Sequence, residues 1–368
     1  MFRGLPVIPD ETYTTNTPRK ISKCFLAAEV EEGVGMRVRR GIGLARLPHL
    51  SPFIMLDHFN STFGNDRDAS APDHPHRVNN TISFTLVLAL PCHFFFLFSP
   101  KPTNIIVLLL LTIHQLSQGQ ETISYIISGG VDHEDFAGNR GTLEAGDLQF
   151  MTAGRGIMHS EIPIHNDNGE PNVGMQLWVD LPKELKYCEP RYRDLKAKEI
   201  PEAVEDGGSG LAFGVESKKE LSYTPVWYLH FTVQPGGSLH QSLPRTWNAF
   251  AYVLEGDIQV SNGSSSSSSS NGEATSRSIG QFHMAVFEQE GDSVSISVSV
   301  DAKEAANFIL VAGLPLDQPI VQYGPFVVTS REEVQQAVRD FRRGENGFER
   351  AVGWVSENSR SRRNSIVV

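Results

Sequence analysis

Short strand-like segments separated by turn residues recur along most of the chain, and they constrain its fold more than any other feature. Examples are MRVRRGIGL (36–44), FIMLDHF (53–59), VGMQLWVDL (173–181), VWYLHFTV (226–233) and NFILVAG (307–313). Apolar and polar residues alternate in several of these segments, and turn residues recur about every 8–12 positions, which is typical of an all-β sandwich or barrel. We therefore expect an all-β protein.

The segments form two series, and a polar, charged stretch lies between them. A hairpin pattern recurs in the two series, as YIISGGV (125–131) and YVLEGDI (252–258). A chain of 368 residues is also long enough for two domains of ordinary size. We therefore expect a duplicated β domain, with one copy in residues 21–184, a linker in residues 185–210 and the second copy in residues 211–352.

Three further segments are expected to lie outside the two β domains or to interrupt them. Residues 1–20 are rich in Thr and Pro and predict a flexible leader, residues 353–368 predict a disordered tail, and residues 261–277 predict a Ser-rich loop within the second domain. A short helix is expected near the C-terminus, because Ser330 and Glu333 have the spacing of a capping box and Gly344 can end the helix.

Composition excludes several classes of protein. The chain has 32 Lys and Arg against 43 Asp and Glu, a net charge of −11, which argues against direct binding to nucleic acid. Three cysteines are too few for a disulfide framework and indicate a reducing compartment. The N-terminus has no apolar segment of the kind found in secretory signals, so we do not expect secretion.

Residues 78–118 differ from the rest of the chain, because they contain no Asp or Glu and only one Lys. A transmembrane helix is one interpretation, but Pro and polar residues break the apolar runs below the length of about 20 residues that a span needs. A buried core segment is a second interpretation. The third is a translated intron, since removing the segment joins Arg77 to Gly119 in a continuous strand–turn–strand sequence. We favour the third interpretation and expect no membrane association.

Two motifs carry the candidate chemistry. His74 and His76 are two residues apart, as are His159 and Glu161, so on β-strands each pair would point to one face. Two such strands facing a barrel interior would bring together three imidazoles and one carboxylate, with open positions for water or substrate. This ligand set suits Fe(II), Mn, Cu, Ni or Zn. A lone pair would more simply be surface or core histidines, but two same-face pairs favour a metal site.

Glu121 is a further candidate. With residues 78–118 removed, His74, His76 and Glu121 have a spacing close to the first motif of the cupin fold. In a generic cupin Glu121 would be a ligand. Because Glu161 competes for that place, we expect Glu121 instead to orient a ligand from outside the coordination sphere.

Several longer stretches resemble the pirin family. They are PDHPHR (72–77), HEDFAGNRGTLEAGDLQFMTAGRGIMHSE (133–161) and GPFVVTSREEVQQAVRDFRRGENGFERA (324–351). The resemblance extends over roughly residues 20–355, apart from the apolar segment and the Ser run. It implies a bicupin, that is, two tandem jelly-roll domains with a short C-terminal helix. It also implies one iron, Fe²⁺, in the N-terminal domain, with ligands at His74, His76, His159 and Glu161. The second domain has only His240 at the corresponding turn and is expected to hold no metal.

The resemblance implies two alternative functions. One is a dioxygenase similar to quercetin 2,3-dioxygenase, in which dioxygen and a flavonol-like molecule are substrates and Glu161 accepts the substrate proton. The other is a redox-sensitive nuclear cofactor that binds a transcription factor and does not catalyse a reaction. In both cases we expect a monomer, and the resemblance implies a location in the cytoplasm and nucleus.

Overall fold

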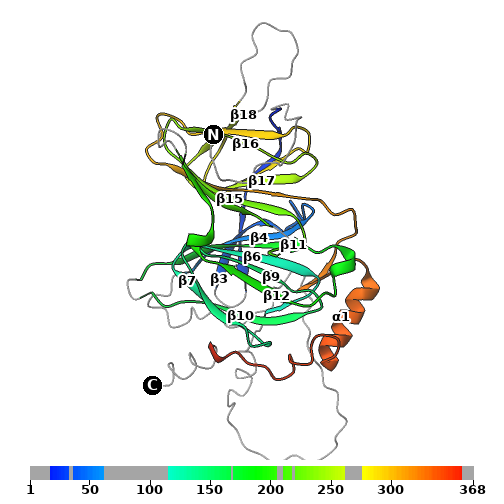
Figure 1. The fold of residues 1–368 in the computed structure, drawn as a ribbon. Coiled ribbons are helices and arrows are strands. Elements are labelled where there is room, and N and C mark those ends of the chain that lie inside the picture. The colour runs from blue at the N-terminus through cyan, green and yellow to red at the C-terminus, as the bar shows by residue number, and fades with distance from the viewer. Residues whose placement is uncertain are drawn as a thin grey trace, which may run out of the picture.

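The computed structural model describes residues 17–32, 36–61, 115–166, 169–204, 210–217, 220–261 and 276–358. Figure 1 shows that the strands of this part of the chain form two β domains stacked one above the other, with a helix beside the lower domain. The expected all-β architecture of two tandem β-sandwich domains with one C-terminal helix is confirmed.

The N-terminal domain contains an inner sheet of seven strands and an outer sheet of four. The inner strands are β2 (Ala28–Glu32), β3 (Met36–Ile42), β4 (Phe53–Ser61), β6 (Gln120–Ser128), β9 (Leu148–Thr152), β11 (Asn172–Asp180) and β12 (Arg191–Leu195), and the outer strands are β5 (Gln115–Ser117), β7 (Gly130–Asp135), β8 (Arg140–Glu144) and β10 (Ile157–Pro163). Their orders are β12-β9-β6-β11-β4-β3-β2 and β5-β10-β7-β8, with antiparallel neighbours throughout.

The C-terminal domain repeats this plan. Its inner strands are β1 (Ile21–Leu26), β13 (Glu202–Val204), β14 (Gly210–Glu216), β15 (Val226–Val233), β17 (Asn248–Glu255), β20 (His283–Phe287) and β22 (Ala306–Gly313), and its outer strands are β16 (Ser238–Ser242), β18 (Ile258–Ser261), β19 (Ser276–Ile279) and β21 (Ser293–Ser297). The orders are β1-β20-β17-β22-β15-β14-β13 and β16-β21-β18-β19. The remaining elements are β23 (Val321–Tyr323), β24 (Phe326–Val328), α1 (Arg331–Arg343) and two short 3-10 turns, η1 (Lys183–Leu185) and η2 (Ala197–Glu199).

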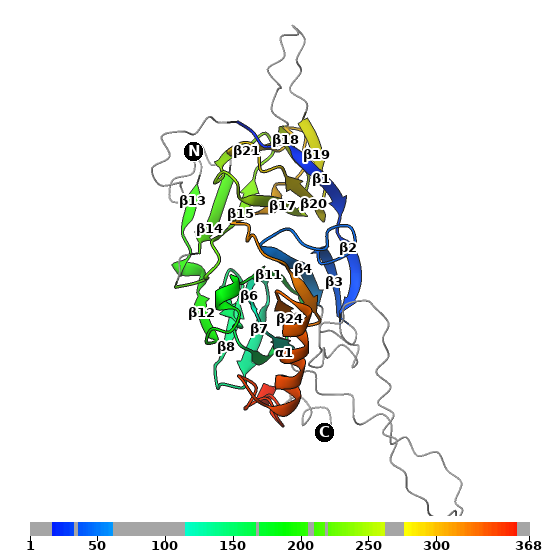
Figure 2. The same cartoon turned by 90° about the vertical axis from the view of Figure 1, so that its right-hand side faces the viewer.

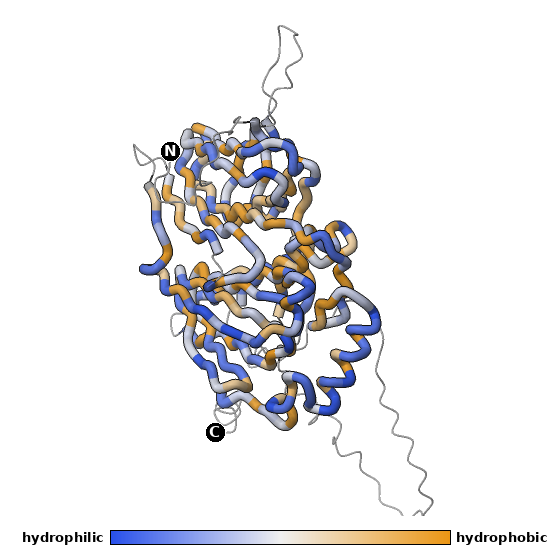
Figure 3. The backbone as a smooth tube through the Cα atoms, turned by 45° about the vertical axis from the view of Figure 1, so that its right-hand side comes forward, coloured by the Kyte–Doolittle hydropathy of each residue, from blue (hydrophilic) through white to orange (hydrophobic). Residues whose placement is uncertain are grey.

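The two inner sheets pack face to face and bury a hydrophobic core between the domains. The sequence of strand β22 is almost entirely apolar because both of its faces are buried. Ile309 and Val311 face this shared core, while Phe308 and Leu310 face the interior of the C-terminal barrel. Alternate residues of a strand point to opposite faces, so a strand that is buried on both faces has no polar side. Figure 3 shows the same pattern along the chain, with hydrophobic stretches in the strands and a largely hydrophilic α1.

The helix forms as its sequence predicts. Ser330 is its N-cap and accepts a hydrogen bond from the Glu333 backbone N–H, while Glu333 completes the capping box. Gly344 ends the helix with a φ of 65°, a conformation that glycine adopts without strain. The helix packs on the N-terminal domain, because Ala337 and the following Phe348 lie in one cluster with Leu116 and Met158.

Strand pairing divides the chain differently from the boundaries expected from the sequence. Strand β1 was expected in the first domain, but it pairs with β20 and so belongs to the second sheet (Figure 2). The expected linker 185–210 contains β12, which pairs with β9, and β13, which pairs with β14. The physical reason is that alternation in a strand fixes which side chains are buried but not which sheet edge the strand joins.

The leader, the tail and the apolar segment are only partly described. Most of the expected leader, apolar segment, Ser-rich loop and tail lie outside the described residues. The ranges concerned are 1–16, 62–114, 262–275 and 359–368. Where the structure begins again, Leu116 and Gln118 are buried and β5 pairs with β10, so the last residues of the apolar segment are part of the fold. Ser356, in the expected tail, is also fully buried.

Candidate metal centre

Strand β10 carries two of the four proposed ligands into the N-terminal barrel. His159 and Glu161 are separated by one residue and therefore share the face that points inward. Met158, the residue just before His159, points outward and packs in the hydrophobic cluster beneath α1. The alternation of β10 thus places an imidazole and a carboxylate together on the barrel wall, with the His159 side chain buried.

The carboxylate of Glu161 is held by two side chains of the inner sheet. The Ser124 hydroxyl on β6 donates to Oε1 at 3.3 Å, and the Gln176 amide on β11 donates to Oε2 at 2.7 Å. Gln176 is itself fixed, because the Trp178 indole N–H donates to its Oε1 at 3.1 Å and Trp178 is packed in the core. Hydrogen bonds of this kind orient a carboxylate for metal binding.

The other two proposed ligands, His74 and His76, lie outside the described residues. Strand β5 occupies the edge of the outer sheet beside β10, with Gln115 opposite His159 and Ser117 opposite Ile157. Within the described ranges no group of three or more His, Cys, Asp or Glu side chains is arranged to hold a metal ion. The donors that the structure does show, His159 and Glu161, fit half of the expected ligand set.

Glu121 does not have the position expected for it. It lies three residues before Ser124 on β6 and therefore points to the opposite face of the sheet, toward the second domain. There its carboxylate accepts hydrogen bonds from Thr152 Oγ1 at 2.6 Å and Ser222 Oγ at 2.5 Å, and from the backbone N–H groups of Tyr223 and Thr224. Glu121 fastens the two domains together and makes none of these bonds to a proposed ligand.

A polar cluster lies next to Glu161 and brings together residues of both sheets of the barrel. His133 on β7 stands opposite Glu161 in the β7–β10 pair, and its Nε2 is 3.2 Å from Asp194 Oδ2 on β12. Gln149 donates to the other oxygen of Asp194 at 2.9 Å. Burial alone would raise the pKa of Asp194, but the hydrogen bonds from His133 and Gln149 outweigh it and hold this pKa below its ordinary value.

Tyr192 completes this cluster. Its ring stacks on that of His133, with centroids 6.2 Å apart. Burial, followed by the negative charges of Asp135 and Glu161, raises the pKa of Tyr192 well above its ordinary value, so its hydroxyl keeps its proton at neutral pH. The sequence signal for this cluster was the alternation of His133 and Asp135 in the segment DHED. Tyr192 and Asp194 were missed because β12 had been assigned to a linker.

The interior of the C-terminal barrel is apolar where that of the N-terminal barrel is polar. Its outer strand β21 lies at the same place in the sheet order as β10, and its inward residues are Val294 and Ile296. They pack in a large hydrophobic cluster with residues such as Phe231 and Phe308. His240, the histidine noted at this turn, is exposed and lies 2.9 Å from the hydroxyl of Ser295.

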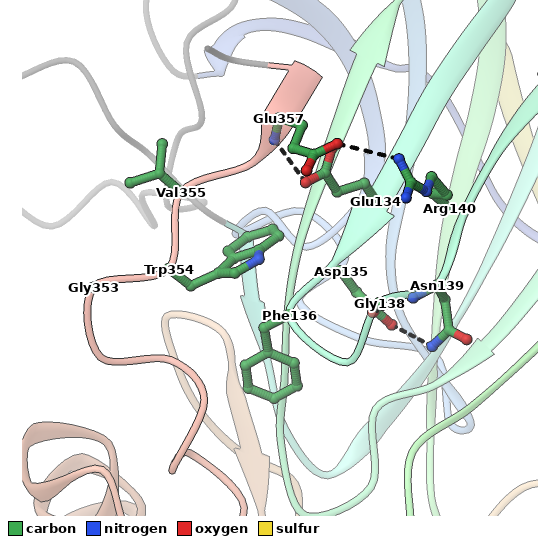
Figure 4. A pocket seen from close by; sticks show the side chains of 10 residues that line it. All are labelled: Glu134, Asp135, Phe136, Gly138, Asn139, Arg140, Gly353, Trp354, Val355 and Glu357. Atoms are coloured by element: carbon green, nitrogen blue, oxygen red, sulfur yellow. Dashed lines mark hydrogen bonds and ion pairs between the residues drawn. The ribbon is translucent and has the colours of Figure 1, made fainter.

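A pocket of about 350 Å³ lies outside the N-terminal barrel, between the β7–β8 turn and the C-terminal segment (Figure 4). Its acidic side chains are engaged, since Glu134 accepts from the backbone N–H of Glu357 and Glu357 pairs with Arg140. Figure 4 shows Trp354 and Phe136 on one side of this hollow. His159 and Glu161 do not line it, so the pocket is separate from the candidate metal centre.

Comparisons with known proteins agree with the domain plan. Two family models match, "Pirin" over residues 111–179 and "Pirin C-terminal cupin domain" over residues 228–347. Pirin from Homo sapiens is 38% identical over 345 residues, covering 92% of this chain and 98% of its own length. His159 and Glu161 fall within the first match.

Solved structures are similar over most of the chain. A quercetin 2,3-dioxygenase from Acinetobacter baumannii is 23% identical, with a TM-score of 0.66 over 89% of this chain and 98% of its own. A bacterial pirin from Escherichia coli in complex with nickel(II) is 15% identical, with a TM-score of 0.50 over 80% and 99% of the two chains. These likenesses show the fold. In the described part of the chain, no helix is long and apolar enough to cross a membrane.

Proposed function

The chain belongs to the pirin family, and from this premise we propose that its N-terminal cupin is the metal centre of a flavonol-cleaving dioxygenase. In this reaction one dioxygen molecule is added to quercetin or a related flavonol, the central ring opens and carbon monoxide leaves. The names of the A. baumannii relatives suggest the reaction class. The argument for this chain comes from its own barrel interior.

One observation carries the proposal. Glu161 stands beside His159 on the wall of the N-terminal barrel, and both of its carboxylate oxygens accept hydrogen bonds. The corresponding positions of the C-terminal barrel are apolar. The half-buried carboxylate of Glu161 and the buried imidazole of His159 are donors of the kind that a metal ion takes, and the hydrogen bonds to Glu161 would hold its carboxylate in orientation for binding.

We assign the metal as iron, Fe²⁺, from the family resemblance, with Mn, Cu, Ni and Zn as alternatives. The nickel(II) in the E. coli pirin shows that a member of the family accepts another metal. His159 and Glu161 would hold the ion, together with His74 and His76. When bound, the ion would supply Lewis acidity that lowers the pKa of the flavonol 3-hydroxyl.

The protein's own side chains would perform the remaining tasks. Glu161 is the carboxylate placed to accept the proton of the 3-hydroxyl, because it stands beside the ligand histidine. Gln176 and Ser124 would keep its two oxygens in place during this transfer. Tyr192, which keeps its own proton, would remain a neutral group stacked on His133.

Oxygen consumption tests the proposal. We expect the iron-loaded protein to consume dioxygen with quercetin and the His159→Ala variant to lose most of this activity. The matched control is His240→Ala, which removes an exposed histidine from the apolar barrel and should leave the rate unchanged. Equal oxygen consumption by the parent protein and His159→Ala, or none by either, would contradict the proposal.

Binding of a transcription factor without catalysis is the alternative, and the arginine-rich strand β3 gives it no support. Arg37 and Arg39 pair with Glu29, and Arg40 is buried between Glu32 and Asp57. The arginine charges of β3 are therefore paired with carboxylates of the same domain. Retention on a transcription-factor column that depends on iron oxidation, without flavonol turnover, would favour this alternative and the nuclear location.

A further inference from the structure

The N-terminal inner sheet presents a row of three side chains to the second domain. His58 on β4 is opposite Met175 on β11, and Met175 is opposite Tyr125 on β6. Paired residues in antiparallel strands point to the same face, so the three side chains form a line across the sheet, histidine at one end and tyrosine at the other.

The C-terminal inner sheet presents an equivalent row. His230 on β15 is opposite Ile309 on β22, and Ile309 is opposite Tyr252 on β17. Tyr125 and Tyr252 are also the first residues of the hairpin pattern that recurs in the two halves of the sequence. The two rows are therefore the same feature of a duplicated domain, with a histidine, an apolar residue and a tyrosine in the same order.

The rows meet head to tail between the domains. His58 Nδ1 is 3.1 Å from the Tyr252 hydroxyl, and His230 Nδ1 is 2.9 Å from the Tyr125 hydroxyl. Each histidine thus contacts the tyrosine of the other domain. A twofold interface has this reciprocity, in which residue i meets j and j meets i. The domain contact behaves as an internal dimer with two equivalent histidine–tyrosine pairs.

Both imidazoles are nearly excluded from solvent, and their surroundings disfavour a positive charge. The Nε2 atoms of His58 and His230 have no hydrogen-bond partner among the described residues. In the described chain, Arg39 from β3 lies beside His58 in the same row, Glu29 from β2 pairs with Arg39 at 3.2 Å, and Tyr252 from β17 faces His58 from the other domain. The titratable groups near His230 are Tyr125 from β6 and Tyr228 on its own strand. The Asp57 carboxylate, next to His58 in sequence, is bound to the buried Arg40. The remaining ring neighbours are Phe282 and Phe213.

We propose that these two pairs form an acid-sensitive latch, which holds the two domains together while both histidines are neutral and releases the interface when they are protonated. Protonation would give each ring an N–H at both nitrogens and a positive charge, and the described chain offers no acceptor for the charged N–H at Nε2. Because the pairs are equivalent, both respond to the same range of pH.

The direction of the effect follows from linkage. Burial lowers the pKa of each histidine to about 4, from 6.5 in the solvated state, and for His58 the charge of Arg39 adds to this. The opened interface therefore binds protons more strongly than the closed one. Opening becomes progressively more favourable as the pH falls below about 6.5, and the effect is complete near pH 4.

Small-angle scattering and far-ultraviolet circular dichroism of the full chain test the latch. We expect the radius of gyration to rise between pH 6 and 4 before the β-sheet signal is lost. In His58→Asn/His230→Asn the midpoint should move down by about one pH unit or more, because Asn keeps an acceptor near the Nδ1 position but does not titrate. The control is His240→Asn/His283→Asn, which removes two histidines that make other contacts and should leave the midpoint unchanged.

Two results would overturn the proposal. One is an identical opening midpoint in the parent protein and in the His58→Asn/His230→Asn variant. The other comes from the parent protein alone, so it does not depend on the variant folding: imidazole resonances of His58 and His230 that titrate near pH 6.5 while the radius of gyration stays constant. Resonances that titrate only together with the rise in radius would support the latch.

Discussion

At the residue scale, Glu121 offers a test that separates domain attachment from metal binding. Glu121→Ala should leave the backbone N–H groups of Tyr223 and Thr224 without their acceptor and destabilise the protein by about 3 kcal/mol. Its iron content should not change, because the side chain faces away from Glu161. Urea unfolding and metal analysis measure the two effects. Glu161→Ala is the control and should show loss of iron. An unchanged stability with lost iron in Glu121→Ala would contradict this assignment.

Sequence reasoning placed some site residues well and others poorly, and the difference has a physical basis. The two-residue spacing of His159 and Glu161 was enough, because strand alternation alone puts both on one face. Glu121 was assigned to the site by its spacing from His76. It lies three residues from Ser124 on β6, and an odd separation on a strand places two side chains on opposite faces, so Glu121 points away from the barrel interior. Asp194 was missed because its partner His133 comes from a different sheet, and such contacts depend on the packing of sheets rather than on any local pattern.

At the scale of elements, the start of β6 depends on Gly119. Its φ is +74°, and a Cβ at this position would lie 2.0 Å from the Val327 carbonyl oxygen. Gly119→Ala should therefore destabilise the fold by roughly 3 kcal/mol, combining backbone strain with a clash against main chain that cannot move aside. Gly324→Ala is the matched control, since φ is +57° there and nothing lies within 4 Å of the added Cβ. Equal unfolding free energies for the two variants, measured in urea, would show that the contact with Val327 has no effect.

The elements themselves were largely predictable, whereas their partners were not. The strand segments and α1 follow from local patterns, because a capping box and alternating burial are properties of a few neighbouring residues. The pairing of β1 with β20 in the second sheet was not predictable, since alternation indicates that a residue such as Phe25 is buried but not which sheet edge its strand joins. The stretch 185–210 is charged because β12 and β13 are edge strands, and edge strands commonly carry charged residues, as linkers do.

At the scale of the whole molecule, two barrels of the same topology differ in the described side chains that fill them. The interior of the N-terminal barrel contains Glu161, Gln176 and His133, whereas that of the C-terminal barrel is filled with hydrophobic side chains. Duplication explains the shared strand order and the matched histidine–tyrosine rows. The proposed metal centre would then depend on which residues form the edge strand β5, since this strand adjoins the one that carries His159.

Removing residues 78–118 tests this dependence. In the shortened chain Arg77 would precede Gly119 directly, so His74 would take the register of Gln115 opposite His159, and His76 that of Ser117. The shortened chain would then present all four proposed ligands in one barrel, and we expect its iron affinity to exceed that of the full chain by about tenfold or more, since even the loss of a group that only supports a ligand costs 10- to 100-fold. Metal titration measures the difference. The same deletion combined with His74→Ala/His76→Ala should cancel the gain in iron affinity. Equal iron affinities of the full and shortened chains would contradict the idea that residues 115–118 take the place of His74 and His76.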